Sequence, residues 1–337
     1  MSNNIQIRLA STPESYPEPH HFNVVEEPIP KPDDGQVLCQ TFYLSLDPYM
    51  RNQIAGRYLN NNIKPGGLML GETISRVVES RHPEFEVGEF VRCFGNWQQY
   101  SVHDASQLQK QAQHAYSPSY ELSILGMPGL TAYAGLMWLV NLKAGATIVI
   151  PAATGAVGST AGQLAKIHGC KVIGIAGSDN KCRYAVEKLG YDSCINRKTE
   201  DLDSKLDQLC PNGIDIYFDL VGGETLNLIC TKLAIGAQII LCGLMADYNS
   251  QTRTPGPLPG AFIGARAIVY GLVVYDFEHR RDEFIKACLP YLKDGRLSIR
   301  EDVSEGIESA PESFCRLMRG ANEGKALVKV FLSLIHI

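Results

Sequence analysis

The sequence predicts an α/β fold in which a doubly wound parallel sheet is inserted into a β-rich domain. Residues 1–122 are short apolar segments separated by turns that contain Pro, Gly and Asp, which is typical of β-structure. Across residues 123–295, strand and helix patterns alternate, as a parallel sheet requires. Residues 296–337 return to a β-like pattern that is too short for a separate domain, so we expect them to complete the first one.

The central part of the chain supplies six predicted strands, enough for a complete doubly wound sheet. Their ranges are 147–151, 171–176, 193–196, 214–219, 237–242 and 267–274. Apolar residues at helical spacing predict helices near 157–168, 180–189, 200–210, 222–234 and 280–293. A helix near 308–319 and a final strand end the chain, whereas residues 333–337 look detached from that strand and are left out of the fold prediction.

The bulk composition is that of an ordinary globular protein and excludes several classes of function. Of 337 residues, 45% are hydrophobic and the net charge is −5, so no general affinity for nucleic acid or an anionic membrane is expected. No apolar run reaches the ~20 residues that span a bilayer, and the N-terminus lacks the regions of a secretory signal. The ten cysteines include no Cys-x-x-Cys pair. We therefore expect a cytoplasmic protein with reduced thiols and no zinc cluster.

A strand–turn–helix segment, residues 147–169, carries the first nucleotide-binding signal. Its turn is GxGxxG with alanine in place of the first glycine, and consists of Ala153, Thr154, Gly155, Ala156, Val157 and Gly158. Gly155 allows the backbone to approach a pyrophosphate, and Gly158 allows the helix to pack closely. The helix N-terminus offers unpaired N–H groups to the phosphates. We expect a dinucleotide here; the alternative is a tight turn with no ligand.

The end of the next strand selects the cofactor. Strands at this position usually end in an acid that holds the adenosine ribose, but here Gly177-Ser178-Asp179-Asn180-Lys181 follows. Ser178 can cap the next helix and donate to an oxyanion. Lys181 stands in the first helical turn, where the helix dipole disfavours a cation, so a 2′-phosphate explains it better than the dipole does. Arg197 would add a second cation. These residues favour NADPH, with a solvated surface role for Lys181 as the alternative.

Several segments together resemble one known family. They are LSLDPYMR (44–51), AATGAVGS (152–159), AGSDNKC (176–182), GIDIYFDLVGGE (213–224), LCGLMADYN (241–249) and GANEGKALVKV (320–330). In this order, they resemble the zinc-independent branch of the medium-chain dehydrogenase/reductase superfamily. The similarity is greatest to the group of NADPH-dependent prostaglandin reductases, leukotriene dehydrogenases, 2-alkenal (double-bond) reductases and bacterial curcumin reductases.

The resemblance implies both an architecture and an activity. It implies a GroES-like β-domain into which a Rossmann domain is inserted, with a cleft between them. It also implies NADPH-dependent reduction of the carbon–carbon double bond of α,β-unsaturated ketones and aldehydes. Zinc-dependent relatives carry a cysteine ligand and a GHE motif where this chain has SLDPYMR and LGETIS, so the resemblance also implies no metal.

Cofactor-binding residues follow from the matched segments. Lys181 matches the family lysine that meets the 2′-phosphate, and Arg197 stands where the family often has tyrosine. Asn322 matches the asparagine near the nicotinamide. The segment LCGLMADYN adds Cys242 and Tyr248 to the expected cofactor site.

Three tyrosines are the expected catalytic residues. The resemblance implies Tyr248 as the residue that orients the cofactor or an enolate, and Tyr49 and Tyr58 as residues that face the substrate. Hydride addition to the β-carbon places negative charge on the carbonyl oxygen, and without a metal a phenol or the cofactor ribose hydroxyl is a suitable hydrogen-bond donor. The alternative for each tyrosine is a packing role with a hydrated hydroxyl.

The apolar segment 267–276 is expected to form the sixth strand at the edge of the sheet. An open apolar edge favours pairing with a second copy of the chain, so we expect a homodimer. Two other functions stay open. One is quinone reduction within the same superfamily, and the other is NADPH binding without turnover.

Overall fold

The computed structural model describes residues 3–59, 61–111 and 116–331, so the segment 333–337 lies outside the described residues. Contacts divide the chain into two compact units. One contains the described residues up to Leu122 and from Glu301 onward, and the other is Ser123–Arg300. Within the described ranges, no helix is long and apolar enough to cross a membrane.

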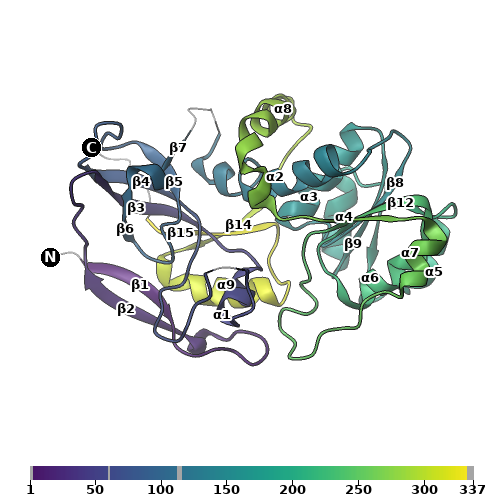
Figure 1. The fold of residues 1–337 in the computed structure, drawn as a ribbon, viewed down its shortest axis with the longest axis horizontal. Coiled ribbons are helices and arrows are strands. Elements are labelled where there is room, and N and C mark those ends of the chain that lie inside the picture. Colours follow the sequence, from purple (N-terminus) through teal and green to yellow (C-terminus); the bar gives the residue numbers. More distant parts are fainter. Residues whose placement is uncertain (1–2, 60, 112–115, 332–337) are drawn as a thin grey trace. The chain divides into compact units, whose positions relative to one another are not determined.

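The first unit is built on a seven-stranded sheet with the order β14-β15-β3-β4-β5-β7, in which β6 also pairs with β3 (Figure 1). Strands β1 and β2 form a separate antiparallel pair. The strands are β1 (Asn3–Leu9), β2 (Phe22–Pro28), β3 (Gln36–Ser45), β4 (Thr73–Ser80), β5 (Phe90–Cys93), β6 (Tyr100–Asp104), β7 (Gln109–Lys110), β14 (Glu301–Glu305) and β15 (Lys325–Lys329).

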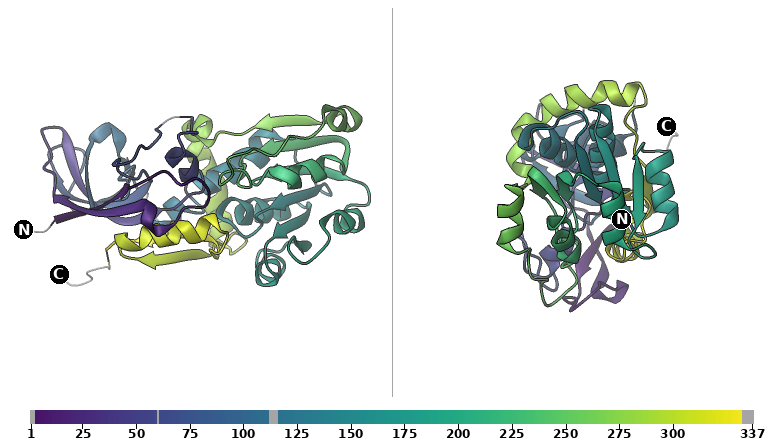
Figure 2. Two further views of the ribbon diagram at one scale, coloured as in Figure 1. Left: turned by 90° about the horizontal axis from the view of Figure 1, so that it is seen from below. Right: turned by 90° about the vertical axis from the view of Figure 1, so that its right-hand side faces the viewer.

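Two helices of the first unit frame the segments that matter for function. They are α1 (Met50–Ile54), which follows β3, and α9 (Ala310–Met318), which packs on β15 (Figure 2). The buried ring of Trp97 lies 5.9 Å from the ring of Phe22 and 5.7 Å from that of Phe314, between ring centroids. This aromatic cluster joins β2 to α9 and so anchors the helix that precedes the GANEGK segment.

The second unit contains a six-stranded, wholly parallel sheet with the order β10-β9-β8-β11-β12-β13 (Figure 1). This is the strand order of dinucleotide-binding sheets, with a topological switch point between β8 and β11. The strands are β8 (Thr147–Pro151), β9 (Lys171–Ala176), β10 (Ser193–Asn196), β11 (Ile214–Asp219), β12 (Leu233–Leu241) and β13 (Ile268–Gly271). The helices are α2 (Met127–Tyr133), α3 (Ala156–Ile167), α4 (Asp179–Glu187), α5 (Leu202–Leu209), α6 (Gly223–Cys230), α7 (Pro259–Ala265) and α8 (Arg281–Lys293). The predicted doubly wound sheet is confirmed.

The sixth strand is shorter than the sequence predicts. The prediction was a strand over 267–274 within an apolar edge segment that reaches residue 276, but β13 ends at Gly271 and Val274–Arg280 forms a 3₁₀ helix. The ring of Phe277 stacks on Trp138 at 5.7 Å, and the Arg280 guanidinium lies 3.9 Å from the centre of the same indole ring. The segment after Gly271 therefore packs on Trp138 as a 3₁₀ helix and does not extend the strand.

Candidate cofactor and substrate site

The glycine-containing turn joins β8 to α3. Ala152 adopts a left-handed conformation with φ 50°, and the N–H of Gly155 donates to its carbonyl at 2.8 Å. Gly155 is the N-cap of α3 and has no side chain, so no side-chain cap bonds the first N–H groups of the helix. A Cβ at Gly158 would collide with the Ala152 carbonyl, so only glycine allows this approach. The close packing predicted for Gly158 is confirmed.

Tyr191 supports this turn from behind, and sequence analysis missed it. The residue is buried, and its hydroxyl donates to the Gly158 carbonyl at 2.8 Å and also lies 3.3 Å from that of Ala153. Its ring occupies the space that a Cβ on Gly162 would need. Burial raises the pKa of Tyr191 well above its usual value, so the phenol keeps its proton and remains a donor. No local pattern reports this role, because Tyr191 follows α4 while its partners lie on α3 and the preceding turn.

Replacing Tyr191 by phenylalanine keeps the ring but removes the donor to Gly158. We expect the free energy of unfolding to fall by about 1–2 kcal/mol, because a buried carbonyl loses its partner. The KM for NADPH should rise as the turn loosens. Urea unfolding and steady-state kinetics check both, and Tyr184→Phe, on a half-buried tyrosine of α4, is the control. Unchanged stability would contradict the supporting role.

The turn after β9 is organised by two side chains. Ser178 is the N-cap of α4, and its Oγ accepts a hydrogen bond from the Lys181 N–H at 3.4 Å, so the predicted capping role is confirmed. Asp179 Oδ1 accepts a hydrogen bond from Asn196 Nδ2 at 2.7 Å, which joins α4 to the end of β10. Asp179 also stands in the first turn of α4, where the helix dipole favours an acid. Asp179 therefore has a structural role, and this role explains why an acid stands here without acting as the usual ribose-binding residue.

The cations near this turn include one that sequence analysis missed. The Arg197 N–H donates to the Ala176 carbonyl at 3.0 Å, which brings the residue after β10 to the end of β9. Lys198 lies closer to the turn, since its Cε is 3.7 Å from the position of a Cβ on Gly177. Both residues are exposed. The Arg-Lys pair that follows a predicted strand is the signal that could have identified Lys198.

Asp219 shapes the end of β11, next to the switch point of the sheet. The fully buried carboxylate accepts hydrogen bonds at Oδ1 from the N–H groups of Val221 and Gly222, at 3.0 and 2.8 Å, and from the Tyr217 hydroxyl at 2.9 Å. Gly222 has φ 68°, a conformation that glycine favours. Burial raises the pKa of Asp219, and these hydrogen bonds oppose the shift. Sequence analysis did not single out Asp219, although it lies within a quoted motif.

The segment after β12 carries two predicted cofactor-site residues. The Cys242 N–H donates to the Asp219 carbonyl at 3.0 Å, so Cys242 lies at the carboxyl end of the sheet. Burial raises the pKa of its thiol to about 12, and the thiol therefore stays protonated. The hydroxyl of half-buried Tyr248 accepts a hydrogen bond from the Leu244 N–H at 3.3 Å. This bond holds the phenol against its own loop.

The first unit brings the other two predicted tyrosines together. The rings of Tyr49 and Tyr58 stack with centroids 5.1 Å apart and an angle of 24° between planes. Both are half-buried, and Tyr49 immediately precedes α1. Asn62 fixes the Tyr58 backbone by hydrogen bonds to its N–H and carbonyl at 3.0 and 3.2 Å. The stacked pair offers an aromatic surface and two phenols from a short segment.

A buried ionic network holds the segment around Tyr49. Lys325 Nζ, 2% exposed, donates to Asp47 Oδ1 at 2.6 Å, to Ser45 Oγ at 2.7 Å and to the Leu46 carbonyl at 2.9 Å. The Ser45 hydroxyl also donates to Asp47. Arg51 donates to the carbonyls of Pro13 and Ser15. The network fixes the loop that presents Tyr49 onto β15.

Asn322 lies in the turn that precedes β15. Its Nδ2 donates to the Gly324 carbonyl at 2.7 Å, and this bond closes the turn just before Lys325. The structure therefore places the predicted nicotinamide-site asparagine at the start of the strand that holds the Tyr49 segment. Lys325 itself lay inside a quoted motif, but no local pattern assigned it a function.

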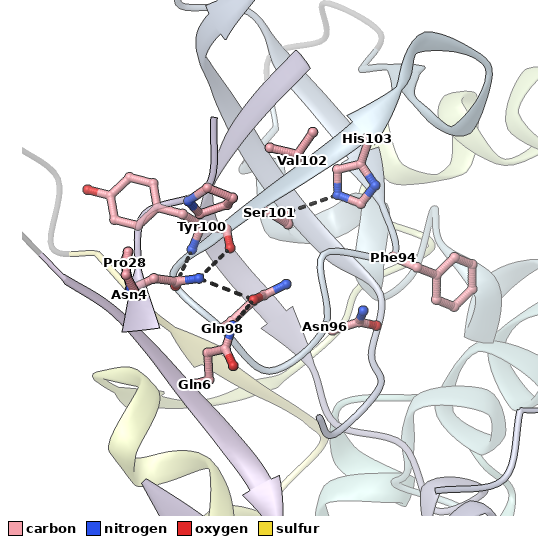
Figure 3. A pocket seen from close by; sticks show the side chains of 11 residues that line it. Asn4, Gln6, Pro28, Phe94, Asn96, Gln98, Tyr100, Ser101, Val102 and His103 are labelled. Carbon is pink, nitrogen blue, oxygen red and sulfur yellow. Dashed lines mark hydrogen bonds between the residues drawn. The ribbon is translucent and has the colours of Figure 1, made fainter. Parts of the chain in front are cut away.

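A pocket of ≈ 340 Å³ in the first unit is separate from these residues (Figure 3). Its wall includes Asn4, Gln98 and Tyr100, joined by hydrogen bonds between Asn4 Nδ2 and Gln98 Oε1 and between Asn4 and the Tyr100 backbone. His103 contacts Ser101 at 2.8 Å on the other side. None of the predicted site residues lines this pocket. Its polar groups join β1 to β6, so we assign them to the fold.

Two family models match the chain. Residues 5–111 match the N-terminal domain of oxidoreductase, and residues 156–288 match the zinc-binding dehydrogenase. In the described part of the chain, no group of three or more His, Cys, Asp or Glu side chains could hold a metal ion. The two models define the class as an oxidoreductase of the dehydrogenase type.

Full-length relatives narrow this class. The chain is 40% identical over 329 residues to an NADPH-dependent curcumin reductase of Escherichia coli, with 96% of this chain and 95% of the relative covered. It is 38% identical to prostaglandin reductase 1 of Bos taurus, with 93% and 95% covered. The crystal structure of CurA in complex with NADPH from Vibrio vulnificus superimposes with a TM-score of 0.93 at 39% identity, covering 98% of this chain and all of that one. The chain belongs to the prostaglandin reductase and curcumin reductase family of zinc-independent medium-chain dehydrogenases/reductases.

Proposed function

We propose that the protein uses NADPH to reduce the carbon–carbon double bond of α,β-unsaturated ketones and aldehydes. The observation that carries this function is the full-length similarity to an NADPH-dependent curcumin reductase. Two features of the second unit agree with this cofactor. The first is the uncapped start of α3 at the glycine turn, and the second is the hydrogen bond that joins Asp179, after β9, to Asn196.

We assign the cofactor contacts as follows. The backbone of residues 153–158 binds the pyrophosphate, because it leads into the N-terminus of α3. Ser178, Lys181 and Arg197 bind the 2′-phosphate, and Lys198 is a further cation beside the same turn. Cys242, Tyr248 and Asn322 complete the nicotinamide end of the site. In this assignment, residues 123–295 form the cofactor domain, and residues 1–122 plus 296–337 form the substrate domain.

The bound cofactor supplies the hydride for the β-carbon of the substrate. The chain supplies a donor to the carbonyl oxygen, where negative charge develops. Tyr248 is the first candidate, because the hydrogen bond that its oxygen accepts orients its O–H group and strengthens it as a donor. The stacked rings of Tyr49 and Tyr58 offer the flat apolar surface that a conjugated enone requires, with their phenols as alternative donors.

A substrate panel tests this function against its two rivals. NADPH oxidation is followed spectroscopically with linear enones, enals and benzoquinones. We expect turnover with enones and enals. Preference for benzoquinones would instead support a quinone reductase, because quinone reduction needs no proton at an α-carbon. NADPH binding without oxidation by any member of the panel would support a non-catalytic role.

We further propose a cytoplasmic homodimer that pairs through β13. This strand is one of the two edges of the sheet, and its Ile268 and Val269 are 51% and 41% exposed. Antiparallel pairing with a second β13 would cover both side chains. All ten cysteines are free thiols, as suits a reducing compartment.

Size-exclusion chromatography with light scattering tests the dimer. We expect twice the chain mass of 37.0 kDa for the unaltered protein. Val269→Lys should shift the equilibrium toward the monomer, since it places a charge in the proposed contact. Val186→Lys, at a 41% exposed position of α4, is the matched control. A monomer at all concentrations would contradict the proposal.

A further inference from the structure

Two of the ten cysteines contact each other beside the nucleotide-binding turns. Cys182 belongs to the first half of α4, and Cys194 belongs to β10. The hydrogen bond between Asp179 and Asn196 holds the first turn of α4 against the end of β10, and so brings Cys182 and Cys194 to face each other. Each thiol shifts the pKa of the other, and both residues are partly exposed. We call them the proximal pair. Neither residue has a role in the proposed chemistry, and neither is needed for the fold in the way that a fully buried thiol is.

The proximal pair lies between the two segments assigned to the cofactor phosphates. Cys194 is the strand partner of Gly174 in β9. A Cβ on Gly174 would lie 3.1 Å from the Cys194 sulfur and 2.8 Å from the Ala153 side chain. The Cys194 sulfur and Ala153, the first residue of the glycine turn, therefore both lie beside Gly174. On the other side, Cys182 directly follows Lys181 in the sequence. A change in the distance between the two sulfurs therefore acts on the position of Lys181.

The thiols are unequal, as a reactive pair requires. The hydrogen bond with Cys194 lowers the pKa of Cys182, against the opposing effects of burial and of the Glu200 and Asp179 carboxylates. The same contact and burial raise the pKa of Cys194. Cys182 is thus the thiol that ionises first, and the thiolate is the nucleophile in thiol oxidation.

We propose that Cys182 and Cys194 are a peroxide-sensitive site whose disulfide weakens the binding of NADPH. The Cys182 thiolate attacks one peroxide oxygen, the O–O bond breaks, and one water leaves after protonation, so Cys182 becomes a sulfenic acid. The Cys194 thiol then attacks this sulfur, the S–S bond forms, and the sulfenic oxygen leaves as a second water. The two thiols lose two electrons and two protons, and one hydrogen peroxide is reduced to two waters.

The effect on NADPH follows from the geometry of the new bond. A disulfide holds its sulfurs about 2.05 Å apart, much closer than two thiols that are not bonded to each other. Closing this distance draws the first turn of α4 toward β10, and Ser178 and Lys181 move with it. The effect on affinity rests on the proposed contact of Lys181 with the 2′-phosphate, whereas formation of the disulfide does not.

The chain contains a matched control pair. The thiols of Cys39 and Cys93 also shift each other's pKa and belong to one core cluster, but they are 0% and 3% exposed and lie in the first unit. We call them the buried pair. If contact between the thiols were sufficient, peroxide would oxidise both pairs. If peroxide must also reach the thiols from solvent, only the proximal pair is oxidised.

The test treats the reduced protein, residues 1–337, with hydrogen peroxide. Mass spectrometry of proteolytic peptides should show a link between residues 182 and 194, with loss of two hydrogens and no link in the buried pair. The KM for NADPH should rise about tenfold, as expected for the loss of one charge-assisted hydrogen bond, and dithiothreitol should restore it. Cys182→Ser and Cys194→Ser should each abolish the response, and Cys39→Ser should retain it.

Three results would overturn the proposal. They are proximal thiols that stay reduced, oxygen added to Cys182 without a link to Cys194, and a disulfide that leaves the affinity for NADPH unchanged. Direct NADPH binding, followed by the fluorescence of the cofactor, gives the same readout without turnover. Failure of the reductase assay would therefore not be mistaken for failure of the thiol site.

Discussion

Lys325→Met is expected to destabilise the first unit by about 3–5 kcal/mol, because it leaves the Asp47 carboxylate buried without its cation. Asp47 is 7% exposed at its side chain, so water does not replace the lost partner. A loss of this size is a large fraction of the stability of a typical domain. The loop that carries Tyr49 should also lose its attachment to β15, and kcat for enone reduction should fall with it.

Two variants separate this effect from the general loss of a lysine. Lys329→Met changes a less buried lysine on the same strand, and we expect a change within about 0.5 kcal/mol. Lys325→Met combined with Asp47→Asn removes both charges and should recover part of the lost stability. Urea unfolding of the three variants measures these differences. Equal stability of Lys325→Met and Lys329→Met would refute the role of the network.

Lys181→Ala should raise the KM for NADPH by about 10–100-fold, as expected for the loss of a charge-assisted contact with phosphate. The KM for NADH should change little, because NADH lacks the 2′-phosphate. The capping bond from the Lys181 N–H to Ser178 is made by the backbone, and the substitution preserves it. Steady-state kinetics with both cofactors measures the difference.

Lys188→Ala is the matched control, since Lys188 is the exposed C-cap residue of the same helix. Single substitutions of Arg197 and Lys198 identify the second cation. Because the Lys198 side chain lies against Gly177, we expect Lys198→Ala to raise the KM for NADPH as well. Equal changes for NADPH and NADH in Lys181→Ala would show that Lys181 does not recognise the phosphate.

In the second unit, sequence patterns predicted best those elements whose structure is determined by residues adjacent in the sequence. The bounds of β8, β9, β10 and β11 agree with their predictions, because each strand is a compact apolar run between turn residues. β12 begins at Leu233, before the predicted residue 237, because Gly236, with φ 80°, interrupts the apolar pattern. α7 was missed because its first residues, Pro259 and Gly260, resemble a loop.

The missed site residues act through contacts between distant parts of the chain. The Tyr191 hydroxyl reaches Gly158, 33 positions away, and Lys325 reaches Asp47, 278 positions away. No periodicity connects such pairs. Asp179 is a different case: it follows a strand that lacks the usual ribose-binding acid, and its bond to Asn196 gives it a structural role. Local motifs therefore predicted the cofactor turns, while the supporting side chains needed the structure.

Product analysis with a simple acyclic enone tests the central claim most directly. The protein is incubated with NADPH and the enone, and the product is identified by nuclear magnetic resonance. The proposed function predicts the saturated ketone, with the carbonyl group intact and one NADPH consumed for each double bond reduced. An allylic alcohol, formed by hydride addition to the carbonyl carbon, or no product despite bound NADPH, would contradict it.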